Sequence, residues 1–137
     1  MKFAVHVLGT GVDLVENDRM REILERWGSR FRDRVFLAEE TRYCEAKASP
    51  WMYYAARFAV KEAVSKAFGT GIGPHLSWLD IEVIRDEASG APSVRLSAKG
   101  LRLADSLGVQ KLLVSLSHTR HFAIAHALLE GPGQTRE

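Results

Sequence analysis

A carboxylate and two lysines lie close together between Phe58 and Gly71 and could bind a metal-bound phosphate. Residues four apart on a helix share a face, so Glu62 and Lys66 can point into the same space. The predicted helix runs into Gly69-Thr70-Gly71, where glycines would let backbone N–H groups approach an anion closely. Lys61 points about 100° away from Glu62 on the helix, which gives it a weaker supporting role near phosphate.

A plainer interpretation of this pair is charge patterning on a solvated helix. A glutamate four residues before a lysine commonly stabilises an exposed helix by about 0.2–0.5 kcal/mol. The face that carries Glu62 and Lys66 also carries Phe58 and Ser65, so it is not uniformly charged. Because this mixed face is followed by glycines instead of an ordinary polar loop, we favour the phosphate site.

Asp13 is a second candidate carboxylate, placed just after a bend predicted at Gly9-Thr10-Gly11. An aspartate in such a place is also a common turn or cap residue, and turn chemistry alone leaves both roles open. The single cysteine, Cys44, excludes an internal disulfide framework and is assigned no chemical role. The histidines other than His118 match no metal-ligand spacing.

Hydrophobic periodicity predicts the elements that must position these residues. Alternating apolar residues indicate strands, and apolar residues at helical spacing, such as Met20, Ile23 and Trp27, indicate helices. In chain order we predict a strand that ends near the glycine bend, helices at about 16–27, 30–36, 38–46 and 50–68, a hairpin with strands at 80–84 and 92–96, a helix at about 98–107, and closing strands at 112–118 and 122–128.

The helix ends carry capping signals. Ser49, followed by a proline, supplies an N-cap for the long helix, and Ser97 can cap the helix at 98–107. In that later helix Leu101, Ala104 and Leu107 are predicted to face inward.

Length, composition and element order predict a single domain of the α+β class, with a mostly antiparallel sheet and a long central helix. The domain covers residues 1–130, and residues 131–137 are predicted to form a flexible tail. No apolar run approaches the roughly 20 residues that cross a bilayer, and the first segment resembles a strand more than a signal peptide, so we expect a cytoplasmic protein without membrane contact. A net charge of +2 is too small to indicate nucleic acid binding.

Four segments together resemble the signature regions of holo-acyl-carrier-protein synthase, the short type of 4′-phosphopantetheinyl transferase. They are Val7-Leu8-Gly9-Thr10-Gly11-Val12-Asp13-Leu14-Val15, then Arg19, then Phe58 to Gly71, then Val114-Ser115-Leu116-Ser117-His118-Thr119. The resemblance extends from about Ala4 to Glu130, in the expected order and spacing. The chain departs from the family pattern mainly after Glu130 and between Ala46 and Met52, where none of the expected chemistry lies.

The resemblance implies transfer of the phosphopantetheine arm from coenzyme A to a serine of apo acyl carrier protein, with release of adenosine 3′,5′-bisphosphate. It implies a Mg²⁺ ion held by Asp13 and Glu62, with Lys66 on a coenzyme A phosphate and His118 near the same phosphates. Phosphoryl transfer depends on positioning and charge neutralisation, and Mg²⁺ commonly takes only one or two protein carboxylates. The proton acceptor stays open between Glu62 and a metal-bound water that Glu62 orients.

The first helix suggests how a protein partner docks. Arg19 and Arg26 lie seven residues apart with Ile23 between them, which makes a basic stripe with an apolar centre, and Arg30 could extend it. Acyl carrier proteins are acidic, and Arg19 matches a family position that contacts the carrier. A plain solvated face is the alternative interpretation of the stripe.

The resemblance also implies a homotrimer with three sites at the subunit interfaces, because the longer type of this family is about two such units fused with the site between them. Asp13 and Glu62 could come from one subunit, and part of the coenzyme A pocket, near His118 or Arg57, from the next.

Two other classes of protein share parts of this pattern. A non-catalytic module that binds the carrier or coenzyme A would use the same basic stripe but would not need both Asp13 and Glu62. An RNA-binding protein would expose aromatic residues between its basic ones, whereas Trp27, Phe31 and Phe36 are predicted to be buried. The enzyme is therefore the favoured hypothesis.

Overall fold

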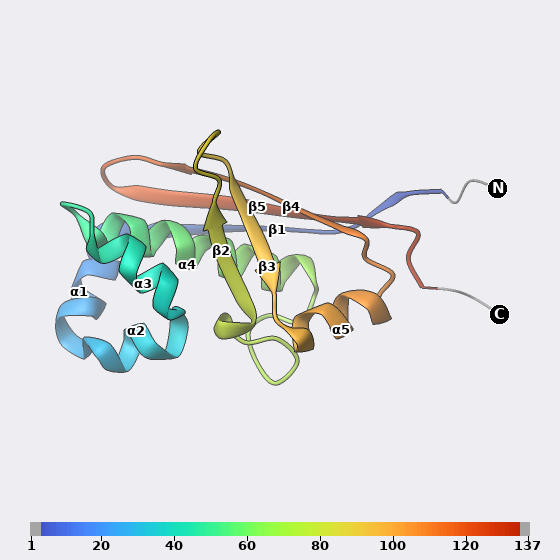
Figure 1. The fold of residues 1–137 in the computed structure, drawn as a ribbon, viewed down its shortest axis with the longest axis horizontal. Coiled ribbons are helices and arrows are strands. Elements are labelled where there is room, and N and C mark those ends of the chain that lie inside the picture. Colours follow the sequence, from blue (N-terminus) through green and yellow to red (C-terminus); the bar gives the residue numbers. More distant parts are fainter. Residues whose placement is uncertain (1–3, 135–137) are drawn as a thin grey trace.

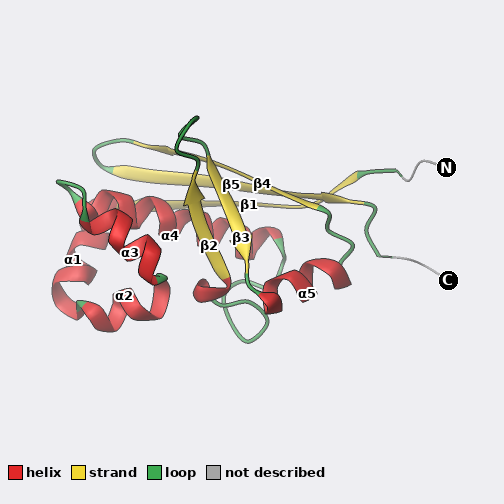
Figure 2. Cartoon of the chain, viewed as in Figure 1, coloured by secondary structure: helices red, strands yellow, loops and turns green. Residues whose placement is uncertain are grey.

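A three-stranded antiparallel sheet forms one layer of the structure, and the helices lie on one side of it (Figures 1 and 2). The structure is a computed structural model that describes residues 4–134. The strands follow the order β1-β5-β4, with bounds β1 His6–Glu16, β4 Lys111–His118 and β5 Phe122–Gly131. A separate two-stranded hairpin, β2 Ile81–Arg85 and β3 Pro92–Leu96, crosses in front of this layer in Figure 1. The α+β class predicted from the sequence is confirmed.

Strand β1 does not end at the glycine bend, so this prediction is wrong. The strand pairs with β5 as far as Glu16, with a register shift only between Val7 and Gly9. A Cβ at Gly11 would lie 2.0 Å from the carbonyl oxygen of Ala63, in the middle of the long helix α4. The glycines are therefore needed because the backbone of α4 lies close against the strand, and they do not form a bend.

Helix α4, Pro50–Ala67, packs along the sheet as the central helix. Small buried residues of β5, namely Ala123, Ala125 and Ala127, face the helix and allow the two layers to lie close together. Ser49 occupies the N-cap position, but its side chain makes no hydrogen bond to the helix end. The helix bounds agree with the prediction to within one residue.

Helices α1 Asn17–Trp27, α2 Ser29–Val35 and α3 Ala38–Glu45 pack beside the first half of α4. They enclose a second hydrophobic cluster that includes Met20, Phe36 and Tyr54. Gly28, with φ at 53°, ends α1 as predicted. Trp27 is 47% exposed and Phe31 is half-buried, so the predicted burial holds only for Phe36 among the three aromatics considered against RNA binding.

The C-terminal half contains a short 3-10 helix η1 Trp78–Asp80, the hairpin and helix α5 Ala98–Ser106. The Ser97 side chain accepts a hydrogen bond from the Gly100 amide and caps α5 as predicted. Ala104 is buried, but Leu101 is 58% exposed, so its predicted inward orientation is wrong.

The predicted tail begins too early. Gly131 closes strand β5, and the Gly133 amide donates to the Gly108 carbonyl over 3.3 Å, so these residues belong to the folded unit. Residues 135–137, the rest of that tail, lie outside the described residues. Within residues 4–134, no helix has the length and apolar character needed to cross a membrane.

Candidate active site

Asp13 and Lys66, 53 residues apart in sequence, meet where β1 lies against α4. The Lys66 ammonium donates to Asp13 Oδ1 at 3.0 Å and to the Val12 carbonyl at 3.1 Å. Asp13 pairs with buried Ala125 in the sheet, so its side chain points to the helix side and is only 17% exposed. The alternation of β1 thus places the carboxylate beneath the last turns of α4.

Asp13 and Glu62 line one cavity of about 320 Å³, built between β1, α1 and α4. Arg19 and Ile23 of α1 and Phe58 of α4 also line it. Glu16 also lines the cavity, which therefore joins three carboxylates, a cation and apolar side chains and suits a polar reaction centre beside a protein-docking helix.

Glu62 is the carboxyl of this site whose pKa is shifted. Burial raises the pKa of its carboxyl, and the nearby Asp13 carboxylate raises it further, whereas the Trp78 indole N–H and the Lys66 ammonium oppose the rise in pKa. Two carboxylates in one partly buried space repel each other, and a bound cation would relieve that repulsion.

Lys61 does not take part in this site, and its predicted role near phosphate is wrong. Its side chain is fully buried, and its ammonium donates to Glu40 Oε1 at 2.7 Å and to the carbonyl oxygens of Trp78 and Ile81 at 2.9 and 2.7 Å. Three acceptors satisfy all three N–H donors. The residue is a structural cation, oriented by the turn of α4 away from Glu62.

Gly69 and Gly71 follow α4 with φ values of 78° and 62°, in the left-handed region that glycine tolerates. A Cβ at either position would meet no atom within 4 Å among the described residues. Backbone conformation therefore accounts for both glycines, and the open space beside them leaves room for a ligand. Their predicted contact with coenzyme A stays a prediction.

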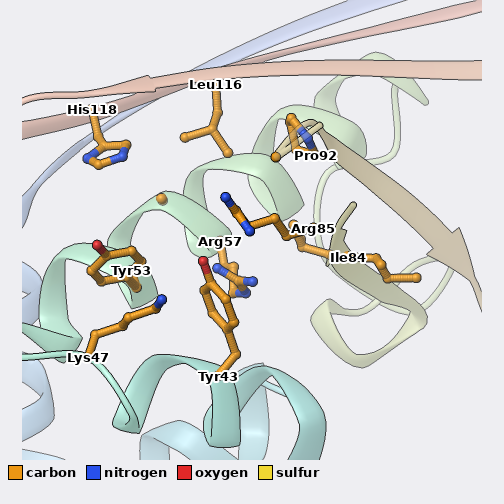
Figure 3. A pocket seen from close by; sticks show the side chains of 12 residues that line it. Tyr43, Lys47, Tyr53, Arg57, Ile84, Arg85, Pro92, Leu116 and His118 are labelled. Atoms are coloured by element: carbon orange, nitrogen blue, oxygen red, sulfur yellow. The ribbon is translucent and has the colours of Figure 1, made fainter. Parts of the chain in front are cut away.

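His118 lines a second cavity of about 400 Å³ (Figure 3), and Glu62 is not among the residues that line it. Its ring centroid is 6.1 Å from that of Tyr53, and Lys47, Arg57 and Arg85 add positive charge around the same space. The Arg57 guanidinium lies 3.9 Å from the centroid of the Tyr43 ring. Within this chain, His118 and the two carboxylates thus line different cavities.

Only part of the predicted docking stripe lines the carboxylate cavity. Arg19 and Ile23 line the carboxylate cavity, whereas Arg26 does not and instead lies over the ring of Trp27, 5.2 Å from its centroid. The stripe therefore reaches from the site to the exposed end of α1.

Sequence reasoning missed several residues of these cavities. Phe122 lines the carboxylate cavity at the start of β5, and Lys47 and Arg85 line the second one. Trp78, which influences Glu62, precedes β2 as a lone aromatic between the predicted long helix and the strand predicted at 80–84. No spacing within a single element could have connected them, because they come from different elements.

Cys44 has no access to either cavity. It is completely buried, and burial raises the pKa of its thiol to about 12. The prediction that it has no chemical role agrees with this, since the thiolate is the reactive form.

The family model described as the 4′-phosphopantetheinyl transferase superfamily matches residues 9–127. The chain belongs to this superfamily. Among relatives in the 4′-phosphopantetheinyl transferase superfamily, a holo-[acyl-carrier-protein] synthase of Ruminiclostridium cellulolyticum is 48% identical over 120 residues, which cover 87% of this chain and 89% of that protein. The enzyme of the same name from Chlamydia trachomatis serovar D is 44% identical over 90% of this chain and its own full length.

Solved structures of similar transferases share the fold. The holo-[acyl-carrier-protein] synthase of Neisseria meningitidis matches with a TM-score of 0.84 and 28% identity, over 90% of this chain and 98% of that one. The Helicobacter pylori enzyme, solved in complex with coenzyme A, matches with a TM-score of 0.77 and 34% identity, over 88% and 98% of the two chains. The resemblance stated from the sequence motifs is confirmed.

Proposed function

We propose that this chain transfers the 4′-phosphopantetheine group of coenzyme A to a serine of apo acyl carrier protein and releases adenosine 3′,5′-bisphosphate. The observation that carries the proposal is the meeting of Asp13 and Glu62 in one cavity, with Lys66 bonded to Asp13 and Arg19 at the cavity wall. This arrangement offers carboxylates, a cation for phosphate and a basic docking helix within one site.

The two carboxylates fit Mg²⁺. Residues 4–134 contain no cluster of three or more His, Cys, Asp or Glu side chains that could hold a metal. A pair of carboxylates is nevertheless the usual protein share of a Mg²⁺ site, because phosphate oxygens and waters complete the octahedron. Asp13 and Glu62 would hold the ion, which would supply charge neutralisation at the diphosphate.

The residues of the chain would then act on a simple displacement. The carrier serine oxygen bonds to the phosphorus that carries the pantetheine arm, and the bond from that phosphorus to the adenosine bisphosphate oxygen breaks. Glu62, whose pKa is raised by burial and by Asp13, is suited to receive the serine proton. Lys66, 53% exposed, can exchange its bond to Asp13 for a phosphate oxygen of coenzyme A.

The second cavity would hold a further part of coenzyme A. The Arg57 side chain is 7% exposed, and its Nε has no hydrogen-bond partner among the described residues. A buried donor without an acceptor favours an anionic ligand in this cavity. Because His118 lies here and not beside Glu62, the two parts of the coenzyme A site would come from neighbouring subunits, as predicted.

The sheet face opposite the helices supports the proposed homotrimer. Apolar side chains that are 42–60% exposed lie on this outer face: Val7, Val12, Leu14, Leu113 and Ile124. In Figure 1 the outer face carries no helix. Broad apolar surfaces of this kind mark protein interfaces, so this face is the proposed contact between copies.

Ile124→Asp is expected to break the assembly into monomers, because it places a charge in the middle of the apolar outer face. Sedimentation velocity would measure the mass, and circular dichroism would check the fold. Leu101→Asp is the matched control, since Leu101 is also exposed but lies on α5, away from the sheet. Trimers that persist in Ile124→Asp, or a wild-type monomer, would contradict the proposed interface.

Arg19→Glu is expected to raise the KM for the carrier by at least about tenfold and to change the KM for coenzyme A little, because the new charge would repel an acidic partner. Steady-state kinetics with each substrate varied in turn would measure both constants. Arg102→Glu, an exposed arginine on α5, makes the same charge change away from the cavity and serves as control. Equal losses for both substrates in Arg19→Glu would rule out the docking model.

The proposed reaction is tested by incubating the chain with apo carrier, coenzyme A and Mg²⁺ and weighing the carrier. A mass gain of one phosphopantetheine is expected. A non-catalytic module would bind the carrier or coenzyme A without this gain. The cytoplasmic location, and the absence of membrane or nucleic acid partners, stay predictions.

A further inference from the structure

Trp78 has a buried indole N–H without a hydrogen-bond partner in the part of the chain that the structure describes. A buried donor without an acceptor is costly, at about 1–3 kcal/mol, and is therefore rare in folded proteins. Such a group commonly marks a place where a partner side chain must move in or a ligand must bind.

The Trp78 ring lies on the face of α4 that carries Glu62. It stacks on Phe58, with ring centroids 6.3 Å apart and an angle of 30° between the planes. Phe58 is one helical turn before Glu62, and both line the carboxylate cavity. The indole N–H also lowers the pKa of Glu62 against the effect of burial, which agrees with this placement.

The backbone of Trp78 is fixed by buried charges. Its carbonyl oxygen accepts a hydrogen bond from the Lys61 ammonium at 2.9 Å. Lys61 in turn binds Glu40, whose second carboxylate oxygen accepts from the Val83 amide at 2.8 Å. Helix α3, helix α4 and strand β2 are thereby joined at one point directly behind the tryptophan.

The short turn that contains Trp78 is closed on its other side as well. Asp80 Oδ2 accepts from the Ser77 amide at 2.8 Å, and Oδ1 accepts from the Ser97 hydroxyl at 2.7 Å. With its backbone held from two sides and its ring packed on Phe58, the indole has little freedom to turn away from Glu62.

We propose that Trp78 is a positioning residue for Glu62: its indole N–H, which has no partner in the structure, takes one oxygen of the carboxylate as its acceptor once that side chain moves toward it, and leaves the other oxygen directed at the reaction centre. Lys61 and Glu40 act through Trp78 by fixing its backbone. The contact follows from the positions of these residues, whereas its effect on turnover rests on the proposed transferase function. Lys61, next to Glu62 in sequence, thus contributes to the site indirectly, by holding the backbone of Trp78.

The contact is tested without any activity measurement by the indole N–H signals in ¹H–¹⁵N NMR spectra of the full chain. The signals of Trp27, Trp51 and Trp78 are assigned by single substitutions to phenylalanine. Glu62→Ala removes the acceptor, so we expect the Trp78 signal to shift upfield and its N–H to exchange faster with solvent, while the other two stay in place.

Asp13→Ala is the matched control, since it removes another carboxylate of the cavity but not the proposed acceptor. The unchanged signals of Trp27 and Trp51 report that each variant is folded, and Glu62→Gln provides a smaller shift if Glu62→Ala fails to fold. The proposal would be overturned if the chemical shift of the Trp78 indole N–H stayed the same in both Glu62 variants, or if it changed equally in Asp13→Ala.

Turnover gives the second readout. Trp78→Phe keeps a ring on Phe58 but removes the N–H, so kcat is expected to fall roughly tenfold with little change in the KM for the carrier. Trp51→Phe is expected to keep kcat. A loss in Trp78→Phe that appears only in the KM for the carrier would overturn the positioning role. If wild-type protein shows no transfer, the proposed function fails, whereas the NMR result still decides the contact.

Discussion

Asp13→Ala and Glu62→Gln should each lower kcat on the order of a thousandfold, the loss expected when a group that stabilises transition-state charge is removed. Both carboxylates line the same cavity, and the Asp13 carboxylate raises the pKa of Glu62, so they act as one charged unit. Removal of either would leave a cation with a single protein ligand. Glu62→Gln keeps the shape of the side chain and removes the charge and the base.

Initial rates at saturating substrates, over a series of Mg²⁺ concentrations, would measure these losses. Glu87→Gln and Asp105→Asn remove exposed carboxylates in the β2–β3 turn and on α5, away from the cavity, and should keep wild-type rates. If Asp13→Ala or Glu62→Gln kept near-normal kcat at saturating Mg²⁺, the assignment of the metal site would be wrong.

Glu40→Ala should lower the free energy of unfolding by about 3–5 kcal/mol, because it leaves the Lys61 ammonium buried without its countercharge. Burial already lowers the pKa of Lys61, and the Glu40 carboxylate offsets part of this effect. Glu40 also accepts from the backbone amides of Leu37 and Val83, so its loss leaves two further donors without partners. Chemical denaturation followed by circular dichroism would measure the change.

A double-mutant cycle separates the ion pair from these backbone contacts. Lys61→Met should also destabilise, and the double variant Glu40→Ala/Lys61→Met should lose at least about 2 kcal/mol less than the sum of the single losses. Glu39→Ala is the matched control, since Glu39 is the adjacent glutamate, 68% exposed, and should change stability by less than about 0.5 kcal/mol. Additive losses would show that the charges do not stabilise each other.

The long helix and its neighbours could be predicted because their signals are local. Helical spacing and capping residues define α4 and α5 without knowledge of the rest of the chain. The glycines of β1 were interpreted as a bend, although their space is taken by the backbone of α4, and that contact depends on a helix more than 50 residues later. A glycine signal alone does not distinguish a turn from close packing.

The carboxylate site could be predicted in part. Helical geometry paired Glu62 with Lys66, and the family resemblance added Asp13. The same geometry showed only that Lys61 points elsewhere, and the acceptors that enclose it come from α3 and the start of β2. The Trp78 contact and the separation of His118 from Glu62 likewise arise between elements, so they required the structure.

The mass of an apo acyl carrier protein after incubation with this chain, coenzyme A and Mg²⁺ tests the central claim most directly. We predict a gain of one phosphopantetheine on the carrier serine, lost when that serine is replaced by alanine, when Mg²⁺ is chelated, or when Asp13→Ala replaces the wild type. An unchanged mass for a folded carrier that a known holo-[acyl-carrier-protein] synthase does modify would contradict the account.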